Sequence, residues 1–380
     1  MKFETKCSYA HPFIPARSLD MECFLILEDG TVFKGSSFGA RKPVFGEIVF
    51  NTGMTGYQES LTDPSYRGQI LTMSYPMIGN YGINSEDYQS GGVHVRAFVV
   101  REMCELPSHR LKEETIHEYL TRNDVPGIYG VDTRALITKI RQHGTMRAAV
   151  TTSSDHEKII NELKQMDFPS ANNLVAEVTC KGIEKYEGGS KKHVVLVDTG
   201  LKLNIQRELV KRFTVTKVPF DHSPDEIRKL KPDALFVTNG PGDPSHPEMM
   251  ATTVRTIREL HQEMPVMGIC LGHQLLGLAL GAKTFKLKFG HRGANQPVGK
   301  DGRVFITSQN HGYAVDEKTL GGTGLEVTLI NQNDKTVEGM RHKELPVFSV
   351  QFHPEANPGP HDTMFLFDEL TKMMEASKCR

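Results

Sequence analysis

The pattern of apolar and polar positions changes along the chain. From residue 192 onward, short apolar runs alternate with segments whose apolar residues recur at helical spacing. In one such segment Val254, Ile257 and Leu260 form a single apolar stripe. Alternating strands and helices are typical of a doubly wound, mostly parallel sheet, in which sites collect at the carboxyl ends of strands. The predicted strands are KHVVLVD, FTVTKVPF, DALFV and PVMGIC, and the predicted helices contain IQRELVKR, SPDEIRKL, MATTVRTIRELHQE and LGHQLLGLALG.

The preceding part of the chain, residues 21–150, begins with short apolar runs separated by turn residues. CFLILEDGTVFKGSSFG predicts a hairpin that turns at Asp29 and Gly30. A helical stripe follows later in GVDTRALITKIRQHG, which Asp132 or Thr133 can cap and Gly144 can end. We therefore predict a strand-rich α+β domain, with further strands in GEIVFNTGM, GQILTMSYP and HVRAFVVREM.

A chain of 380 residues is long enough to form two or three hydrophobic cores. The apolar and polar patterns divide it into four parts. Residues 1–20 precede the first predicted strand and form an N-terminal extension. The α+β domain spans 21–150 and the α/β domain spans 192–380. Between them, 151–191 is a connecting segment with one predicted helix, DHEKIINELKQM, and a predicted linker, KYEGGSKK.

Composition excludes several classes of protein. The 45 basic and 46 acidic residues balance, which argues against a nucleic-acid footprint or a polybasic membrane patch. No apolar run is long enough to span a bilayer, and the first twenty residues lack the apolar core of a secretory signal. The six cysteines lie far apart, so we expect neither a zinc knuckle nor a disulfide framework, and a reducing, cytoplasmic location. The 16 histidines show no ligand spacing, so we expect no metal site on this chain.

Cys270 lies where a predicted strand meets a predicted helix. Its flanking residues, Gly268 and Gly272, match the spacing of a nucleophile elbow and can accept a strained turn. A helix N-terminus favours a thiolate, and the Leu271 N–H would be free to bind an oxyanion. Taken alone, the pattern fits a small buried structural residue as well as a nucleophile.

A base and its orienting partner are offered by QFHPEA. Pro354 favours an extended backbone at His353, and residues two apart in an extended segment face the same side. Glu355 could therefore orient His353, although both fit an ordinary polar loop when considered in isolation. Together with Cys270 they complete a nucleophile, a base and an orienting carboxylate.

The turn TNGPGDP follows another predicted strand. Its residues Gly240 and Gly242 leave backbone N–H groups accessible, and at the end of a neighbouring strand these could supply the second half of an oxyanion hole. Without that context the segment is simply a tight turn.

Together, GICLGHQ, NGPGDP and QFHPEA resemble the signatures of class I glutamine amidotransferase domains. Other stretches resemble the small, glutamine-hydrolysing subunits of carbamoyl phosphate synthetases, in the same order from about residue 22 to 377. The resemblance implies a Rossmann-like C-terminal amidotransferase domain behind an N-terminal domain peculiar to this family. These stretches are LEDGTVFKGSSFG, GEIVFNTGMTGYQESLTDPSY, IGNYGIN, YGVDTRAL, KFGHRGANQPV, QNHGYAVD and PEANPGPHDT.

The resemblance also implies a role for individual residues. Cys270 would be the nucleophile, His353 the base and Glu355 its orienting partner. Lys202 is a further, weaker candidate for a glutamine contact. The implied glutamine contacts are Ser65, Gly240, Gly242, Leu271, Gln274, Asn310, Gly312 and Tyr313. Because Ser65 belongs to the N-terminal domain, the site would draw on both domains.

The implied activity is hydrolysis of L-glutamine to glutamate and ammonia through a glutamyl thioester. The ammonia would pass through an internal tunnel to a large synthetase subunit that makes carbamoyl phosphate from bicarbonate and ATP. Neither G-x-x-x-x-G-K-[ST] nor G-x-G-x-x-G occurs here, so we expect ATP and Mg²⁺ on the large subunit and no cofactor on this chain. The expected assembly is a heterodimer or a higher assembly of heterodimers, serving arginine or pyrimidine biosynthesis.

Three other functions are compatible with parts of the sequence. The chain could be the amidotransferase subunit of another synthetase, such as one for anthranilate or guanylate, but the N-terminal motifs count against this. It could be a regulatory subunit with a vestigial glutaminase, which the intact set Cys270, His353 and Glu355 disfavours. It could also be a stand-alone cysteine hydrolase of the α/β-hydrolase type, which FHPEA and NGPGD disfavour.

Overall fold

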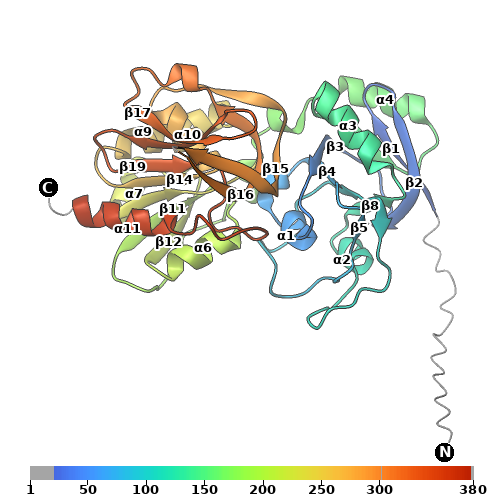
Figure 1. The fold of residues 1–380 in the computed structure, drawn as a ribbon, viewed down its shortest axis with the longest axis horizontal. Helices are drawn as coiled ribbons and strands as arrows, with labels where there is room; N and C mark the ends of the chain where they lie inside the picture. The colour runs from blue at the N-terminus through green and yellow to red at the C-terminus, as the bar shows by residue number, and fades with distance from the viewer. Residues whose placement is uncertain (1–20, 301, 378–380) are drawn as a thin grey trace, which may run out of the picture.

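The computed structural model describes residues 21–300 and 302–377, so the predicted N-terminal extension lies outside the described residues. The chain forms two bodies that lie side by side, a strand-rich one built by the first part of the chain and a larger sheet with helices built by the second (Figure 1). This arrangement confirms the predicted strand-rich α+β region followed by an α/β region. None of the described helices has both the length and the apolar character that crossing a membrane requires.

The N-terminal body is a closed barrel with strand order β1-β2-β8-β6-β4-β3-β9. The predicted hairpin is present, since β1 pairs antiparallel with β2 and the Leu27 N–H bonds the Thr31 carbonyl across the turn. The sequence did not predict that these strands would close into a barrel. Because β9 pairs with β1, none of the barrel strands has an unpaired edge. The barrel strands are β1 (Glu22–Leu27), β2 (Val32–Gly39), β3 (Val44–Asn51), β4 (Gln69–Met73), β6 (Ala97–Val99), β8 (Pro126–Tyr129) and β9 (Met146–Thr151).

Short helices cover the barrel. The predicted α3 begins after Asp132, whose side chain accepts the Ala135 N–H, and ends at Gly144 with φ 96°. HVRAFVVREM, predicted as one strand, forms β6 in the barrel and β7 in a separate two-stranded sheet with β5. The remaining elements here are α1 (Tyr57–Leu61), η1 (Pro64–Tyr66), β5 (Met77–Ile78), β7 (Glu102–Met103), α2 (Ile116–Arg122) and α3 (Thr133–His143).

The connecting segment contributes to both bodies. Helix α4 (His156–Gln165) packs Ile159 and Leu163 against Phe24 and Ile26 of the barrel. The predicted linker KYEGGSKK begins inside a short strand, β10, which pairs antiparallel with β12 of the second body. Between α4 and β10 lie η2 (Pro169–Ala171) and α5 (Val175–Val178), and β10 spans Glu184–Tyr186.

The second body is a ten-stranded sheet with order β10-β12-β11-β13-β14-β19-β18-β17-β15-β16. Strands β12, β11, β13, β14 and β19 are parallel, as predicted, but the strands beyond β19 are antiparallel, so the sheet is only half parallel. The strands are β11 (His193–Asp198), β12 (Thr214–Pro219), β13 (Ala234–Val237), β14 (Val266–Ile269), β15 (Thr284–Lys300), β16 (Arg303–Val315), β17 (Leu325–Asn331), β18 (Val337–His342) and β19 (Val347–Val350), with η3 (Glu317–Thr319) before β17.

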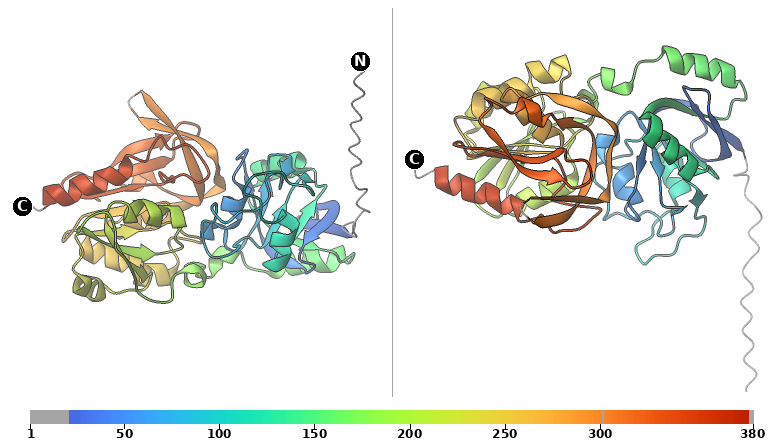
Figure 2. Two further views of the ribbon diagram at one scale, coloured as in Figure 1. Left: turned by 90° about the horizontal axis from the view of Figure 1, so that it is seen from below. Right: turned by 45° about the horizontal axis from the view of Figure 1, so that its top comes forward.

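Helices cover both faces of the parallel half (Figure 2). Alternate residues of β11 point to opposite faces: Val195 packs with α7, α9 and α10, whereas Leu196 packs with α6 and α11. The predicted single helix MATTVRTIRELHQE is broken at Thr252 (φ −111°, ψ −94°) into two helices. The helices are α6 (Leu203–Val210), α7 (Pro224–Leu230), α8 (Pro247–Ala251), α9 (Thr253–Leu260), α10 (Leu271–Ala279) and α11 (Leu366–Ser377).

Candidate active site

Several of the candidate site residues follow the carboxyl ends of four adjacent parallel strands, β11, β13, β14 and β19. Lys202 follows β11, Gly240 follows β13, Cys270 follows β14 and His353 follows β19. Strands β14 and β19 pair directly, and the Cys270 N–H bonds the Val350 carbonyl at 2.9 Å. Parallel pairing therefore brings residues far apart in sequence to one edge of the sheet.

Cys270 occupies a sharp turn between β14 and α10. Its φ of 55° and ψ of −103° are unusual for a residue with a side chain. The strained backbone conformation therefore occurs at Cys270 itself, whereas the sequence had suggested that Gly268 and Gly272 would accommodate the strain. Those glycines are required by space: a Cβ on Gly268 would lie 2.5 Å from the Gly272 carbonyl oxygen, and one on Gly272 would lie 2.2 Å from that of Val237.

Gly272→Ala should therefore destabilise the protein, by roughly 1–3 kcal/mol for an overpacked site. The contact is with backbone, which cannot rotate away, so the turn that carries Cys270 must shift. Denaturant unfolding measures the loss. Gly277→Ala in the same helix is the matched control, since its new Cβ would meet only side chains, the nearest at 3.2 Å. Equal effects of the two substitutions would contradict this account.

His353 and Glu355 form a completely buried pair. The Nδ1 of His353 lies 2.6 Å from Oε1 of Glu355, as expected for a base and the carboxylate that orients it. The Nε2 of His353 has no hydrogen-bond partner although it is buried. The Cys270 thiol donates to the Asn310 carbonyl, with an Sγ–O distance of 3.6 Å. The imidazole therefore presents an unoccupied nitrogen at the edge of the sheet that carries the thiol.

The side chain of Lys202 contacts the carboxylate of Glu355 and does not line the cavity where glutamine is expected to bind. Its buried Nζ lies 3.3 Å from Oε1 of Glu355 and donates to the Ala356 carbonyl at 2.9 Å. Burial alone would raise the pKa of Glu355, but its interactions with His353 and Lys202 outweigh burial and hold the pKa below its usual value. Lys202 therefore keeps the orienting carboxylate ionised.

Lys202→Met should lower the free energy of unfolding by about 3–5 kcal/mol, because it leaves a buried carboxylate short of its compensating charge. Chemical denaturation at neutral pH measures the change. The control is Lys372→Met, which breaks an exposed ion pair with Glu369 and should cost at most about 1 kcal/mol. A loss from Lys202→Met as small as that of the control would show that the buried pair does not depend on the ammonium.

The electrostatics of Cys270 differ from the sequence-based expectation. Burial, followed by the nearby carboxylates of Asp63 and Glu355, raises the pKa of the thiol, and the Leu271 N–H and Lys202 only partly oppose this. The helix N-terminus does act in the predicted direction, but it is outweighed. The resting group is thus a neutral thiol, which requires a base to become a nucleophile.

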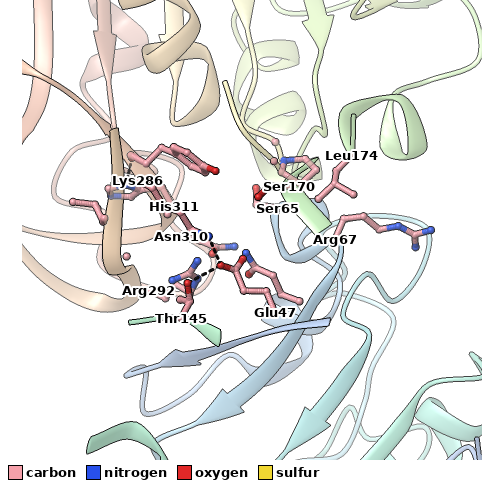
Figure 3. Close-up of a pocket in the computed structure, with 18 of the residues that line it drawn as sticks. Glu47, Ser65, Arg67, Thr145, Ser170, Leu174, Lys286, Arg292, Asn310 and His311 are labelled. Atoms are coloured by element: carbon pink, nitrogen blue, oxygen red, sulfur yellow. Dashed lines mark hydrogen bonds and ion pairs between the residues drawn. The ribbon is translucent and has the colours of Figure 1, made fainter. Parts of the chain in front are cut away.

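A cavity of about 600 Å³, partly open to solvent, lies between the barrel and the sheet (Figure 3). The described residues that line this cavity do not include Leu271, His353 or Glu355. The Leu271 N–H nevertheless faces the Cys270 sulfur. His353 lines a second cavity, of about 310 Å³. The sequence-derived candidates that line the first cavity are Ser65, Gly240, Gly242, Cys270, Gln274, Asn310, Gly312 and Tyr313.

Side chains from both bodies hold these residues in place. Asp63 accepts the Ser65 N–H at 2.9 Å with one oxygen and the Asn310 amide at 2.8 Å with the other. Asn239 donates to the Ser65 hydroxyl at 3.0 Å. Asp63 and Asn239 were not singled out from the sequence, although each lies in or beside a stretch that carried the resemblance. The barrel thus places Ser65 against the turn that follows β13.

Gln274 makes its own connection across the sheet. Its Nε2 donates to the Tyr313 carbonyl at 2.8 Å and to the Gln351 side chain at 3.0 Å. Both of its amide hydrogens are thus used inside the protein. Its oxygen is the atom that remains for a ligand.

Four charged side chains that sequence reasoning missed also line the cavity: Glu47, Arg67, Lys286 and Arg292. One oxygen of Glu47 accepts both the Lys286 ammonium and the Thr145 hydroxyl, each at 2.7 Å (Figure 3). Arg67 pairs with Glu177 at 2.6 Å. Glu47 and Arg292 lie within stretches that had been quoted, GEIVFNTGMTGYQESLTDPSY and KFGHRGANQPV, but neither was named there as a site residue.

Three buried groups could hold a metal ion: His291, His311 and Glu338 offer atoms within 4.8 Å of one another. Tertiary pairing brings them together, so their sequence spacing gave no signal. The network already balances its charges, because His291 contacts Asp334 at 2.8 Å and Glu338 at 3.7 Å. Burial opposes protonation, but these two carboxylates outweigh it and raise the pKa of His291 to about 9. We interpret the cluster as an ion-paired network behind the cavity.

This network predicts a pH-dependent stability. The pKa of His291 is raised from 6.5 to about 9 on folding, so its stabilisation is complete below 6.5 and disappears as the pH rises toward 9. The free-energy difference between the protein and its His291→Gln variant should therefore shrink by up to about 3 kcal/mol across this interval. Urea unfolding at both ends of the interval measures it, with the exposed His109→Gln as control. A constant difference would mean that His291 is neutral throughout.

Two family models match the chain, and together they cover most of it. One, described as the carbamoyl-phosphate synthase small chain CPSase domain, matches residues 25–150. The other, glutamine amidotransferase class-I, matches residues 195–373. The first match coincides with the barrel and the second with the sheet that carries Cys270 and His353.

Curated relatives extend the similarity over nearly the whole chain. A carbamoyl phosphate synthase small chain of Archaeoglobus fulgidus is 54% identical over 359 residues, covering 93% of this chain and 99% of the relative. Proteins of the same name from Fusobacterium nucleatum (92% and 98% covered) and Methanosarcina mazei (90% and 96% covered) are each 50% identical. The chain therefore belongs to the family of carbamoyl phosphate synthase small chains.

Proposed function

We propose that the chain hydrolyses L-glutamine to glutamate and ammonia and supplies the ammonia to a large synthetase subunit that makes carbamoyl phosphate. The observation that carries the proposal is the buried His353–Glu355 pair, whose free Nε2 lies at the strand edge shared with Cys270. A cysteine, a histidine and an orienting carboxylate are the groups that acyl transfer through a thioester requires. The family to which the chain belongs supports this choice of reaction.

The first step in the proposed mechanism is proton transfer from the Cys270 thiol to Nε2 of His353. The resulting thiolate attacks the side-chain carbonyl carbon of glutamine, and the carbonyl oxygen becomes an oxyanion. The Leu271 N–H, with that of Gly240 or Gly242, stabilises this oxyanion; one such donor is worth about 3–4 kcal/mol. The negative charge of Glu355 stabilises the imidazolium meanwhile.

The second half of the mechanism returns the enzyme to its starting state. The His353 imidazolium gives its proton to the departing nitrogen, so ammonia leaves and a glutamyl thioester remains on Cys270. Water then loses a proton to His353 and attacks the thioester carbonyl. Glutamate is released, and the thiol regains its proton from the imidazolium.

The partner and the location belong to the same proposal. The chain lacks the phosphate-binding motifs that ATP chemistry would use, which supports a second chain for ATP and Mg²⁺. The second cavity, which His353 lines, supports a route for ammonia away from the thiol. All four cysteines among the described residues are free thiols, which supports a reducing, cytoplasmic compartment.

The test uses the chain together with its large subunit, co-purified from the source. We expect glutamine hydrolysis that rises when ATP and bicarbonate are added, and acid quenching of the reaction with labelled glutamine should trap label on the protein. Failure to hydrolyse glutamine, both alone and in the complex, would overturn the proposal. Hydrolysis stimulated instead by the substrates of another synthetase would reassign the partner.

A further inference from the structure

The backbone turn that carries His353 and Glu355 is held by the start of helix α6. The side-chain amide of Asn204, in the first turn of α6, donates to the Glu355 carbonyl at 2.6 Å. The ammonium of Lys202, which immediately precedes the helix, donates to the Ala356 carbonyl at 2.9 Å. Within the turn itself, the Ala356 N–H donates to the His353 carbonyl at 3.1 Å. Two side chains of one helix end therefore fix the turn that presents the proposed base.

This turn has an unfavourable backbone conformation. Ala356 and Asn357 have φ angles of 56° and 51°, in the left-handed region that residues with a side chain rarely adopt. Such conformations persist only where the surrounding structure enforces them. Glu355 and Ala356 are completely buried, so water cannot take the place of the donors on α6. The shape of the turn therefore depends on the hydrogen bonds that α6 supplies.

The first turn of α6 is itself fixed from both bodies. The N–H groups at the start of a helix have no partner within the helix. Here the Leu203 N–H donates to the Gln89 carbonyl of the N-terminal body at 2.8 Å, and the Lys202 N–H donates to Oδ1 of Asn239 at 3.1 Å. The helix end that carries Asn204 is thus a firm support, to which the barrel contributes.

We propose that Asn204 is a positioning residue, which holds the carboxylate of Glu355 in place and so keeps the His353 imidazole in its catalytic orientation. This deepens the proposed glutaminase function and rests on it. A displacement of about 1 Å in a catalytic group can lower a rate about 100-fold. Asn204 is not among the described residues that line the cavity beside Cys270 or the second cavity. Its loss should therefore act on kcat rather than on KM.

The first measurement is steady-state glutamate release by the complete two-subunit enzyme that carries Asn204→Leu. We expect kcat to fall roughly 10- to 100-fold while KM stays within about twofold. Asn204→Gln keeps an amide donor and should recover part of the loss. The matched control is Asn123→Leu, because the Asn123 amide also donates to a backbone carbonyl, that of Tyr119 at 2.8 Å, but lies at the end of α2. The control should keep kcat within about twofold.

A double-mutant cycle distinguishes positioning of the base from general support of the fold. If Asn204 acts through His353, adding Asn204→Leu to His353→Asn should lower the residual kcat by less than about twofold. Damage elsewhere in the site would instead cost the same factor with and without His353. The cycle therefore measures a coupling that a merely structural residue would not show.

Two kinds of result would overturn the role of Asn204 while leaving the glutaminase intact. One is an equal fold loss in the two backgrounds, and the other is a kcat for Asn204→Leu that matches the unmodified enzyme, with or without a change in KM. An unmodified complex that cannot hydrolyse glutamine would overturn the proposed function instead. If urea unfolding shows that Asn204→Leu does not fold, Asn204→Ala, which adds no apolar bulk, takes its place in the cycle and is judged by the same results.

Discussion

Replacing Cys270 by alanine will abolish glutamine hydrolysis, with a fall in kcat of at least about 10³-fold. The reason is chemical: without sulfur no thioester can form, and no other nucleophile among the described cavity residues stands at the turn after β14. A coupled glutamate assay on the two-subunit complex measures the change. Carbamoyl phosphate synthesis from added ammonia should persist, because the proposed ATP chemistry lies on the large subunit.

The matched control for this variant is Cys180→Ala. Cys180 is a half-buried free thiol whose pKa is raised to about 12 by burial and by Asp198, and it does not line the cavity. Its replacement should leave glutamine hydrolysis within about twofold of the unmodified chain. Undiminished hydrolysis by Cys270→Ala would contradict the proposed mechanism, and loss in both variants would point to a fold that tolerates neither change.

Replacing His353 by asparagine should lower kcat by roughly 10²- to 10⁴-fold with little change in KM. The raised pKa of the Cys270 thiol makes this effect large, because a neutral thiol depends on a base to become a nucleophile. Steady-state kinetics between about pH 6 and 9 provide the measurement. The variant should recover part of its activity as the pH rises, since hydroxide then competes for the thiol proton.

His273 provides the contrasting variant, because it is the histidine nearest to Cys270 in sequence. It is completely buried, its Nδ1 lies 2.9 Å from the Ser349 hydroxyl, and burial lowers its pKa to about 3. His273→Asn should lower the unfolding midpoint but leave the kcat of the folded enzyme within about threefold. A loss of kcat as large as that of His353→Asn would show that the base has been misassigned.

Local patterns in the sequence predicted the elements that depend on local chemistry. The stripe of Val254, Ile257 and Leu260 does pack onto the sheet, and Asp132 does cap α3. The break at Thr252 was missed because the apolar spacing continues across it. The antiparallel half of the sheet was missed for a different reason. The long strands β15 and β16 are interrupted by register shifts and rich in polar residues, so they lack the alternation that identifies a strand.

The sequence around each proposed catalytic residue also predicted its local geometry. The spacing of Gly268, Cys270 and Gly272 predicted a turn that only close backbone packing can explain, and His353 and Glu355 were predicted to share one side of an extended segment. These predictions succeeded because each depends on residues that are near neighbours in the chain. The resemblance to small subunits of carbamoyl phosphate synthetases then supplied the reaction.

The sequence by itself therefore determined the family, the order of the two bodies and the residues proposed for chemistry. The tertiary structure decided the electrostatics: burial beside Asp63 and Glu355 keeps the Cys270 thiol protonated, and Lys202 pairs with Glu355 rather than lining the cavity. It also brought the charged side chains of Glu47, Lys286 and Arg292 to the cavity wall. The physical reason is that solvation and charge pairing depend on what surrounds a group in space, and those neighbours come from strands far apart in the sequence.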